Sequence, residues 1–143
     1  MHSTGRARNL AAEPQAVVVD ASAVVEVLLR SALGYRASEW MRGRRMHAPA
    51  HLDAEVLSAF GRLHRAGEID ESVVAAALDR LHAAPIERHP LASLLKGAWT
   101  RRDNQRLVDA LYLELAATLG GVSILTTDGR LARSHPDVEL VAL

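Results

Sequence analysis

Apolar and polar positions along the chain alternate between short, almost wholly apolar runs and longer stretches in which apolar residues recur every three or four positions. The apolar runs are typical of strands buried on both faces of a parallel sheet, and the periodic stretches are typical of helices. Strands are predicted at 16–20, 46–49, 86–89, 122–127 and 138–141. Helices are predicted at 23–28, 34–45, 52–65, 71–83, 90–99, 105–119 and 130–133. Strands separated by helices predict an α/β fold with a mostly parallel central sheet covered on both faces.

Short polar side chains before several of these helices predict where they begin. Ser22, Asp70 and Asp103 are candidate N-caps, since a side-chain oxygen at that position can accept a hydrogen bond from a free backbone N–H. Pro90 is expected to open the helix that it precedes. The basic residues at the end of the 34–45 helix are expected to lie at its negative pole.

Length and composition limit the kinds of protein that this chain can be. With 143 residues, of which 49% are hydrophobic, the chain can bury one core, so we expect one domain over 16–143. Residues 1–15 lack periodicity and are expected to form a flexible tail. No apolar run reaches the length of a membrane-spanning helix and no signal peptide is recognisable, which predicts a soluble cytoplasmic protein.

The absence of some residue types excludes several chemistries. There is no cysteine, so disulfides, zinc–thiolate sites and thiol nucleophiles are excluded, and any metal must be held by oxygen or imidazole. The formal net charge is zero, so the whole chain is not a polycation. Lys96 is the only lysine among 17 cationic residues, which fits either bidentate phosphate contacts or a coding bias toward arginine.

Four carboxylates are expected to reach one edge of the sheet. Asp20 and Asp128 follow the two most apolar strands, and Glu55 and Asp109 lie at the margins of apolar helix faces. Each has an ordinary structural explanation: Asp20 as a cap, Asp128 in an Asp-Gly turn, Asp109 at a helix N-terminus and Glu55 as a rim residue. Together they would repel one another unless a cation lies between them. Oxygen ligands favour Mg²⁺ or Mn²⁺, and metal-dependent phosphodiester hydrolysis is the chemistry that follows.

Four motifs in this order resemble the PIN-domain ribonucleases, and specifically the VapC toxins of VapBC toxin–antitoxin systems. They are VDAS at 19–22, EVL with GRL over 55–63, DALYLELA at 109–116 and LTTDGRLA at 125–132. The resemblance covers nearly the whole chain from Ala16 onward. It implies a PIN-like three-layer α/β/α sandwich.

The resemblance also implies a set of site residues. Asp20 and Asp109 would be the main metal ligands, and Glu55 and Asp128 would complete the acidic catalytic pocket and orient water or a second ion. The hydroxyl residues that would support the pocket by hydrogen bonds are Ser22 and Thr127. In this family the reaction is Mg²⁺-assisted hydrolysis of RNA, often transfer or ribosomal RNA.

The resemblance implies protein partners as well. A VapB-type antitoxin would hold the enzyme inactive, and the chain would form a homodimer, with a heterotetramer or larger assembly when the antitoxin is bound. The faces of the first two helices, around Val24, Leu28, Leu33 and Trp40, could form the antitoxin groove or could pack on the sheet.

Basic and aromatic residues are candidates for contacts with RNA. Arg101, Arg102 and Arg106 lie close in sequence to Asp109 and could bind phosphates near an acidic pocket. The aromatic side chains Trp40, Trp99 and Tyr112 could stack on bases, but a core position is the stronger expectation for each. No histidine has the paired spacing of a zinc motif, and His51 is expected at the surface.

Two other functions fit parts of the sequence. One is a PIN scaffold that binds RNA or a protein without cleaving it, which the presence of all four acids disfavours. The other is a phospho-receiver signalling domain, in which the aspartate that ends a central strand accepts a phosphoryl group. That site needs an acidic pair before the first strand and a lysine after a late strand. Neither is present here, because Lys96 falls within a predicted helix.

Overall fold

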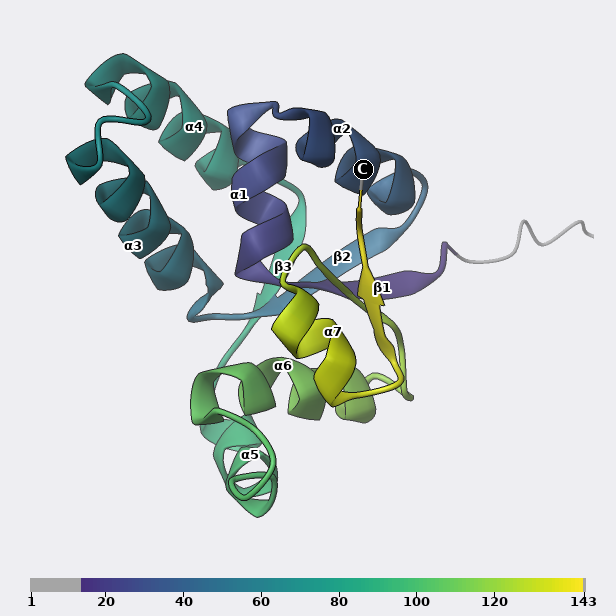
Figure 1. Ribbon diagram of the computed structural model, residues 1–143. Coiled ribbons are helices and arrows are strands. Elements are labelled where there is room, and N and C mark those ends of the chain that lie inside the picture. Colours follow the sequence, from purple (N-terminus) through teal and green to yellow (C-terminus); the bar gives the residue numbers. More distant parts are fainter. Residues whose placement is uncertain (1–13, 143) are drawn as a thin grey trace, which may run out of the picture.

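A five-stranded, all-parallel sheet forms the centre of the protein (Figure 1). The structure, a computed structural model, describes residues 14–142, so most of the predicted 1–15 tail lies outside the described residues. The strand order is β3-β2-β1-β4-β5, which places β1, the strand that Asp20 follows, in the middle. The strands are β1 (Ala16–Val19), β2 (Arg45–Pro49), β3 (Ile86–His89), β4 (Ile124–Thr126) and β5 (Val138–Leu140).

Helices cover both faces of this sheet and give the expected three layers. Figure 1 shows one group above the sheet and another below it. The upper group is α1 (Ala21–Leu29), α2 (Ala32–Met41), α3 (Leu52–Arg65) and α4 (Glu71–Ala83). The other helices are η1 (Ala92–Leu94), α5 (Leu95–Thr100), α6 (Leu107–Thr118) and α7 (Gly129–Ser134). The predicted PIN-like α/β/α sandwich is confirmed.

Each face of the sheet has its own hydrophobic core, because successive side chains of a strand point to opposite faces. Val17 and Val19 of β1 pack with α1 to α4, around the fully buried Phe60. Val18 packs on the other side with α6, around the fully buried Tyr112. The central strand is therefore shielded on both faces, as its unbroken apolar sequence predicts.

The start of α1 and the end of α2 differ from the prediction. Asp20, not Ser22, is the N-cap of α1: its backbone is extended and its carboxylate accepts a hydrogen bond from the Ser22 N–H. The second helix ends at Met41 instead of extending to 45. Arg45 instead begins β2, where it pairs in register with Ala16 of β1, so strand pairing overrides the local helical pattern.

The segment before α6 also differs. Pro90 is followed by the short 3₁₀ turn η1 and then α5, so it does not open a regular α-helix directly. Asp103 does not cap α6, whose N-cap is Arg106 without a side-chain bond. The backbone N–H groups of Asn104 and Gln105 both bond to the Arg101 carbonyl, and these turns carry Asp103 away from the helix start.

Of the three aromatic side chains considered for stacking on bases, two lie outside the core. Tyr112 is fully buried, as predicted, but Trp40 is 40% exposed and Trp99 is 57% exposed, so their predicted core positions are wrong. Each indole instead contacts a guanidinium, Arg44 on Trp40 and Arg102 on Trp99. The cation–π contact and the apolar stem of the arginine cover part of each ring without burying it.

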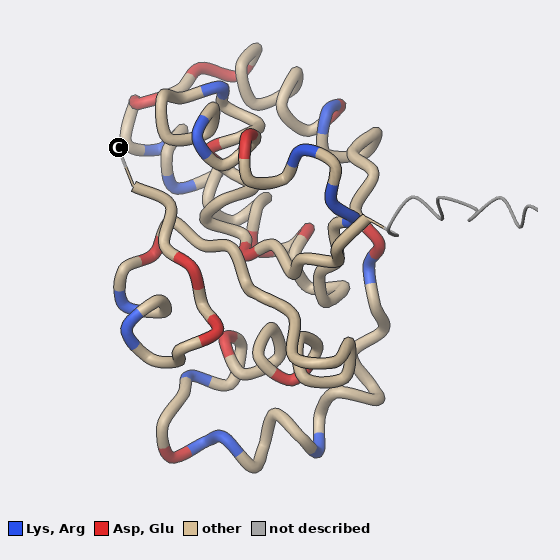
Figure 2. The backbone as a smooth tube through the Cα atoms, turned by 90° about the vertical axis from the view of Figure 1, so that its right-hand side faces the viewer, with Lys and Arg blue, Asp and Glu red and all other residues tan. Residues whose placement is uncertain are grey.

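Acidic and basic residues alternate along much of the described chain. In the view of Figure 2, acidic and basic positions are interleaved along the chain, in line with the zero net charge. Within residues 14–142, no helix is both long and apolar enough to span a bilayer.

The close approach of α1 and α2 predicts opposite effects for two Gly→Ala changes. A β-carbon at Gly34 of α2 would overlap the backbone carbonyl of Glu26 in α1, and a backbone group cannot move aside easily. Gly34→Ala is therefore expected to lower the free energy of unfolding by about 1–3 kcal/mol, as overpacking does. The measurement is urea unfolding followed by circular dichroism.

Gly61→Ala is the matched control. Gly61 lies inside α3, and the only close neighbour of its β-carbon would be the flexible end of Arg65, at 3.3 Å. Alanine is the better helix former, so this variant is expected to gain about 0.5–1 kcal/mol. A gain of similar size in both variants would contradict the packing described for Gly34.

Candidate active site

The register of the sheet places Asp20 beside Thr126. Val19 of β1 pairs with Leu125 of β4, and the Asp20 N–H donates to the Leu125 carbonyl at 2.9 Å. The next positions in this register are Asp20 and Thr126, so their side chains lie next to each other on the face of the sheet that α6 covers. Asp20 is only 6% exposed, which makes it one of the most buried charged side chains described.

Two hydroxyl groups hold the Asp20 carboxylate. The Ser22 hydroxyl donates to Oδ2 at 2.6 Å and the Thr126 hydroxyl donates to the same oxygen at 2.9 Å. Ser22 is one of the two hydroxyl residues predicted for this role, and the other hydroxyl that contacts Asp20 belongs to Thr126, not to Thr127. Thr127 contributes its backbone N–H, which donates to the Ser22 hydroxyl at 3.0 Å. All of these bonds to Asp20 end on Oδ2.

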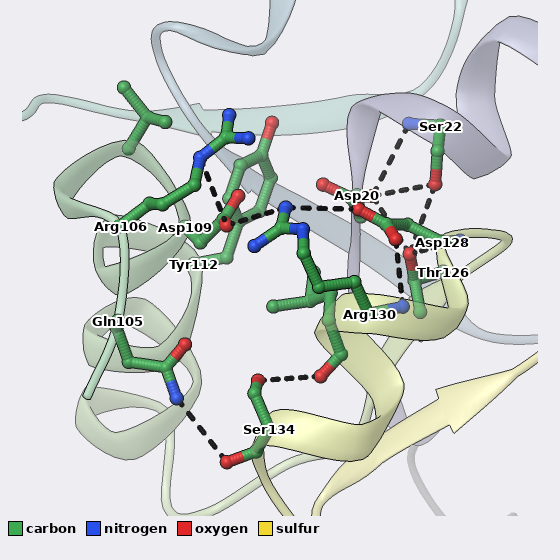
Figure 3. Close-up of polar contacts among 12 residues, drawn as sticks. Asp20, Ser22, Gln105, Arg106, Asp109, Tyr112, Thr126, Asp128, Arg130 and Ser134 are labelled. Carbon is green, nitrogen blue, oxygen red and sulfur yellow. Dashed lines mark hydrogen bonds and ion pairs between the residues drawn. The ribbon is translucent and has the colours of Figure 1, made fainter.

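Arg130 joins two further carboxylates of the predicted set (Figure 3). Its guanidinium lies 3.0 Å from Oδ2 of Asp109, which comes from the first turn of α6, and 3.1 Å from Oδ2 of Asp128. Asp128 follows β4 and caps α7, and its backbone N–H donates to the Thr126 hydroxyl at 3.0 Å. Asp20, Asp109 and Asp128 are therefore linked through Thr126 and Arg130.

Glu55 reaches the same region from α3. Its Oε1 accepts a hydrogen bond from the Tyr112 hydroxyl at 2.8 Å and lies 3.0 Å from Nε2 of His51. Burial alone would raise the pKa of Glu55, but the bonds from His51 and Tyr112 outweigh burial and lower it. Burial, with the charges of Asp20 and Glu55, raises the pKa of Tyr112 far above its ordinary range, so the phenol keeps its proton and remains a donor.

The buried position of the Asp20 carboxylate disfavours its charged form. Burial raises its pKa above the ordinary value of 3.8, and the hydrogen bonds from Ser22 and Thr126 only partly oppose this rise. The negative charge of Glu55 raises it further, which shows that the two carboxylates interact electrostatically. Burial removes water from this carboxylate, and a cation bound nearby would compensate for that loss.

Comparison with known proteins identifies the family of this chain. The PIN domain family model matches residues 17–134. Ribonuclease VapC3 of Mycobacterium tuberculosis is 54% identical over 129 residues, covering 90% of this chain and 93% of that protein. The chain belongs to the PIN-domain family of VapC ribonucleases. Ribonuclease VapC12 of the same organism is 36% identical, over 88% of this chain and 99% of its own length.

Two solved structures share the PIN fold with this chain. PAE2754 of Pyrobaculum aerophilum has a TM-score of 0.64 and 23% identity, covering 89% of this chain and 84% of that one. VapC20 of Mycobacterium tuberculosis, described as a toxin that cleaves the sarcin-ricin loop, has a TM-score of 0.57 and 22% identity. That match covers 82% of this chain and 94% of VapC20. These likenesses concern the fold.

The three arginines predicted to bind RNA differ from one another in their exposure and in their partners. Arg106 is 64% exposed at its side chain and lies 3.7 Å from Asp109. Arg102 is exposed and lies over Trp99. Arg101 is only 28% exposed at its side chain and pairs with Glu114 at 3.4 Å, so it joins α5 to α6.

Sequence reasoning missed several residues that contact the four acids. Arg130 follows Asp128 by two positions, yet nothing in the sequence showed that it would cross to Asp109. His51 was expected at the surface but is only 13% exposed at its side chain. Its spacing of four residues before Glu55 on a helix was the available signal. Tyr112 was correctly expected in the core, but its hydroxyl also serves the site.

The raised pKa of Asp20 predicts that its charge destabilises the metal-free fold. A proton binds Asp20 more tightly in the folded than in the unfolded chain, so stability falls as pH rises through the interval between the two pKa values. Asp20→Asn removes the charge and keeps an oxygen for Ser22 and Thr126. In a chelator, we expect this variant to unfold at a higher temperature than wild type at pH 7, with the difference closing toward about pH 4.

Asp70→Asn is the control, because the pKa of Asp70 is lowered in the folded chain, whereas that of Asp20 is raised. Hydrogen bonds from Ser72 and Val73 lower the pKa of this exposed cap, so its charge supports the fold above that pKa. No gain in melting temperature at pH 7 is expected for this variant. If Asp20→Asn were less stable than wild type at pH 7, the proposed electrostatic cost at Asp20 would be wrong. Thermal unfolding by circular dichroism across pH 4–8 makes the measurement.

Proposed function

We propose that this VapC-family chain is a Mg²⁺-dependent endoribonuclease and the toxin of a type II toxin–antitoxin system. The observation that carries the proposal is the convergence of Asp20, Glu55, Asp109 and Asp128 at the carboxyl edge of one parallel sheet, with Asp20 and Asp109 each only 6% exposed. Ligands of α/β folds bind at this edge. The 54% identity to ribonuclease VapC3 supports the same reaction.

The donor set fits a hard divalent cation. Carboxylate oxygens are what Mg²⁺ and Mn²⁺ prefer, and the cost of burying the Asp20 charge falls when a cation is bound nearby. Asp20 and Asp109 would be the direct ligands, and Oδ1 of Asp20 is the oxygen that the hydroxyl bonds leave for this role. Glu55 and Asp128 would complete the pocket.

The remaining residues position these acids for hydrolysis. A bound divalent cation supplies activation of water and neutralisation of charge on a phosphate. Ser22 and Thr126 fix the orientation of Asp20, and Tyr112 fixes that of Glu55. Arg130 holds Asp109 and Asp128 together through its guanidinium. When RNA enters, this guanidinium would pair with a phosphate instead.

RNA must approach an acidic pocket, so basic groups near its mouth are needed. Arg106 and Arg102 are exposed and suit phosphate contacts, whereas the pairing of Arg101 with Glu114 suits a structural role. We propose a structured transfer or ribosomal RNA as the substrate; VapC20, which shares the fold, is described as acting on the sarcin-ricin loop.

The proposed docking surface for a VapB-type antitoxin is a groove that none of the four acids lines. A largely apolar groove of about 500 Å³ runs between α1, α2 and the segment before β3. Val24, Val27, Leu28 and Tyr35 are among its lining residues, so two of the four residues predicted there line it. Such a groove suits the apolar face of a partner helix.

The homodimer implied by the resemblance would need a second apolar surface. Leu95, Trp99 and Leu107, at the junction of α5 and α6, are between 46% and 57% exposed and offer one. We propose this face for self-association, with a heterotetramer or larger complex when the antitoxin binds. Light scattering of the purified chain measures the assembly, and a monomer at all concentrations would contradict the homodimer.

Cleavage of a mixed structured RNA by the purified chain tests the proposed reaction. Discrete cuts are expected with Mg²⁺ and none with chelator. Asp20→Asn and Asp109→Asn are each expected to slow cleavage by at least about 100-fold, which corresponds to roughly 3 kcal/mol in the barrier.

Arg102→Glu is expected to weaken RNA binding while cleavage at saturating RNA persists.

Asp103→Asn is the matched control, because Asp103 is an exposed acid near α6 that contacts none of the four carboxylates. It is expected to cut as wild type does. Equal cleavage by wild type and the Asp20 and Asp109 variants would mean a contaminating nuclease. The chain would then be a PIN scaffold that binds RNA or a protein without cutting.

A charge placed in the groove tests the partner surface. Val27→Asp is expected to weaken capture of the product of an adjacent short reading frame by at least about tenfold, because the carboxylate would be buried on binding. Val73→Asp, on the exposed side of α4 and outside the groove, is the matched control and is expected to bind normally. Equal affinity of both variants would place the antitoxin elsewhere.

A further inference from the structure

Three side chains with metal-ligating atoms meet on the two strands at the β3 edge of the sheet. His47 of β2 pairs in register with Glu87 of β3, and Pro49 pairs with His89. Because side chains alternate along a strand, His47, Glu87 and His89 share one face of the sheet. This His/Glu cluster uses none of the four carboxylates of the proposed nuclease site.

The orientation of β3 is fixed from the opposite face. Arg88, between Glu87 and His89, pairs with Asp53 of α3 at 3.0 Å. Its guanidinium also donates to the backbone carbonyls of Leu81 and Ile86. With Arg88 held on that side, Glu87 and His89 are directed to the other side, toward His47.

The distances in the cluster suit a tetrahedral ion. Nδ1 of His47 lies 2.9 Å from Nε2 of His89 and 3.3 Å from Oε2 of Glu87, and all three atoms lie within 4.8 Å of one another. Zinc–nitrogen bonds of about 2.0–2.1 Å place tetrahedral ligand atoms about 3.3 Å apart. His47 is buried, with 6% of its surface exposed, whereas the side chain of Glu87 is 66% exposed.

Hydrogen bonding alone leaves this cluster poorly satisfied. If Nδ1 of His47 is protonated, its one hydrogen must be shared between Nε2 of His89 and Oε2 of Glu87. If instead Nε2 of His89 donates a hydrogen to Nδ1 of His47, then Nδ1 is an acceptor and the Glu87 oxygen lies beside its lone pair. A cation between the three atoms removes the conflict.

We propose that His47, Glu87 and His89 form a binding site for a divalent transition metal ion, with Zn²⁺ the best match. Two imidazoles and one carboxylate suit Zn²⁺, whereas Mg²⁺ prefers oxygen ligands alone. A solvent molecule would complete the fourth position beside the exposed Glu87. The ion would cross-link the edge strand β3 to β2, and its binding does not depend on the proposed nuclease activity.

Zinc titration of the full chain after chelator treatment tests this site. The experiment uses a variant with both Asp20→Asn and Asp109→Asn, so that the carboxylate pocket cannot account for binding. Calorimetry with zinc sulfate is expected to give one ion per chain, with a higher melting temperature. Adding His89→Gln or Glu87→Gln is expected to weaken zinc affinity by at least about tenfold and to abolish the thermal shift.

His82→Gln in the same background is the matched control, because His82 is exposed on α4 and outside the cluster. It is expected to bind zinc as tightly as the parent does. Circular dichroism of the metal-free variants checks that each is folded, and Glu87→Gln, at an exposed position, keeps the test valid if His89→Gln misfolds. Zinc affinity unchanged by Glu87→Gln and His89→Gln, or no zinc binding below millimolar concentration, would overturn the proposal.

Discussion

Burial of the Asp20 carboxylate at the end of the central strand is the constraint around which the site is built. The strand must be apolar to lie between two helical layers, and its next residue then carries a charge into a poorly hydrated position. The Ser22 and Thr126 hydroxyls and the N-terminus of α1 offset part of the cost. The pKa of Asp20 still rises, so the site favours a cation. Arg130 neutralises the neighbouring Asp109 and Asp128 in the same way.

The fold was predictable where buried apolar runs and helical periodicity coincide with the final packing. The buried strands β1 and β4 and the helices α3 and α4 were found at nearly their observed positions, because their apolar patterns match burial directly. Arg45 was misplaced because strand pairing with Ala16 is not visible in local sequence. Trp40 and Trp99 were misplaced because a contact with arginine partly covers each exposed ring, and the apolar pattern of the sequence does not indicate such a contact.

The site was predictable for acids placed by strand ends and family motifs, and less so for residues that reach it from a distance. Thr126 and Thr127 are adjacent in sequence, and a shift of one position decides which hydroxyl faces Asp20. The contact of Arg130 with Asp109 spans two helices. His47 and His89 lie 42 positions apart, so no local spacing indicated their contact; it follows from the pairing of β2 with β3.

A crystal structure of the chain grown with Mn²⁺ and recorded at an anomalous-scattering wavelength tests most directly whether the buried acids exist to hold a cation. The expected result is an ion about 2.0–2.3 Å from carboxylate oxygens of both Asp20 and Asp109, with the Arg130 guanidinium withdrawn from Asp109. The contradicting result is a structure without Mn²⁺ at Asp20 and with Arg130 still paired to Asp109 and Asp128. The carboxylates would then form a purely structural ion-pair cluster.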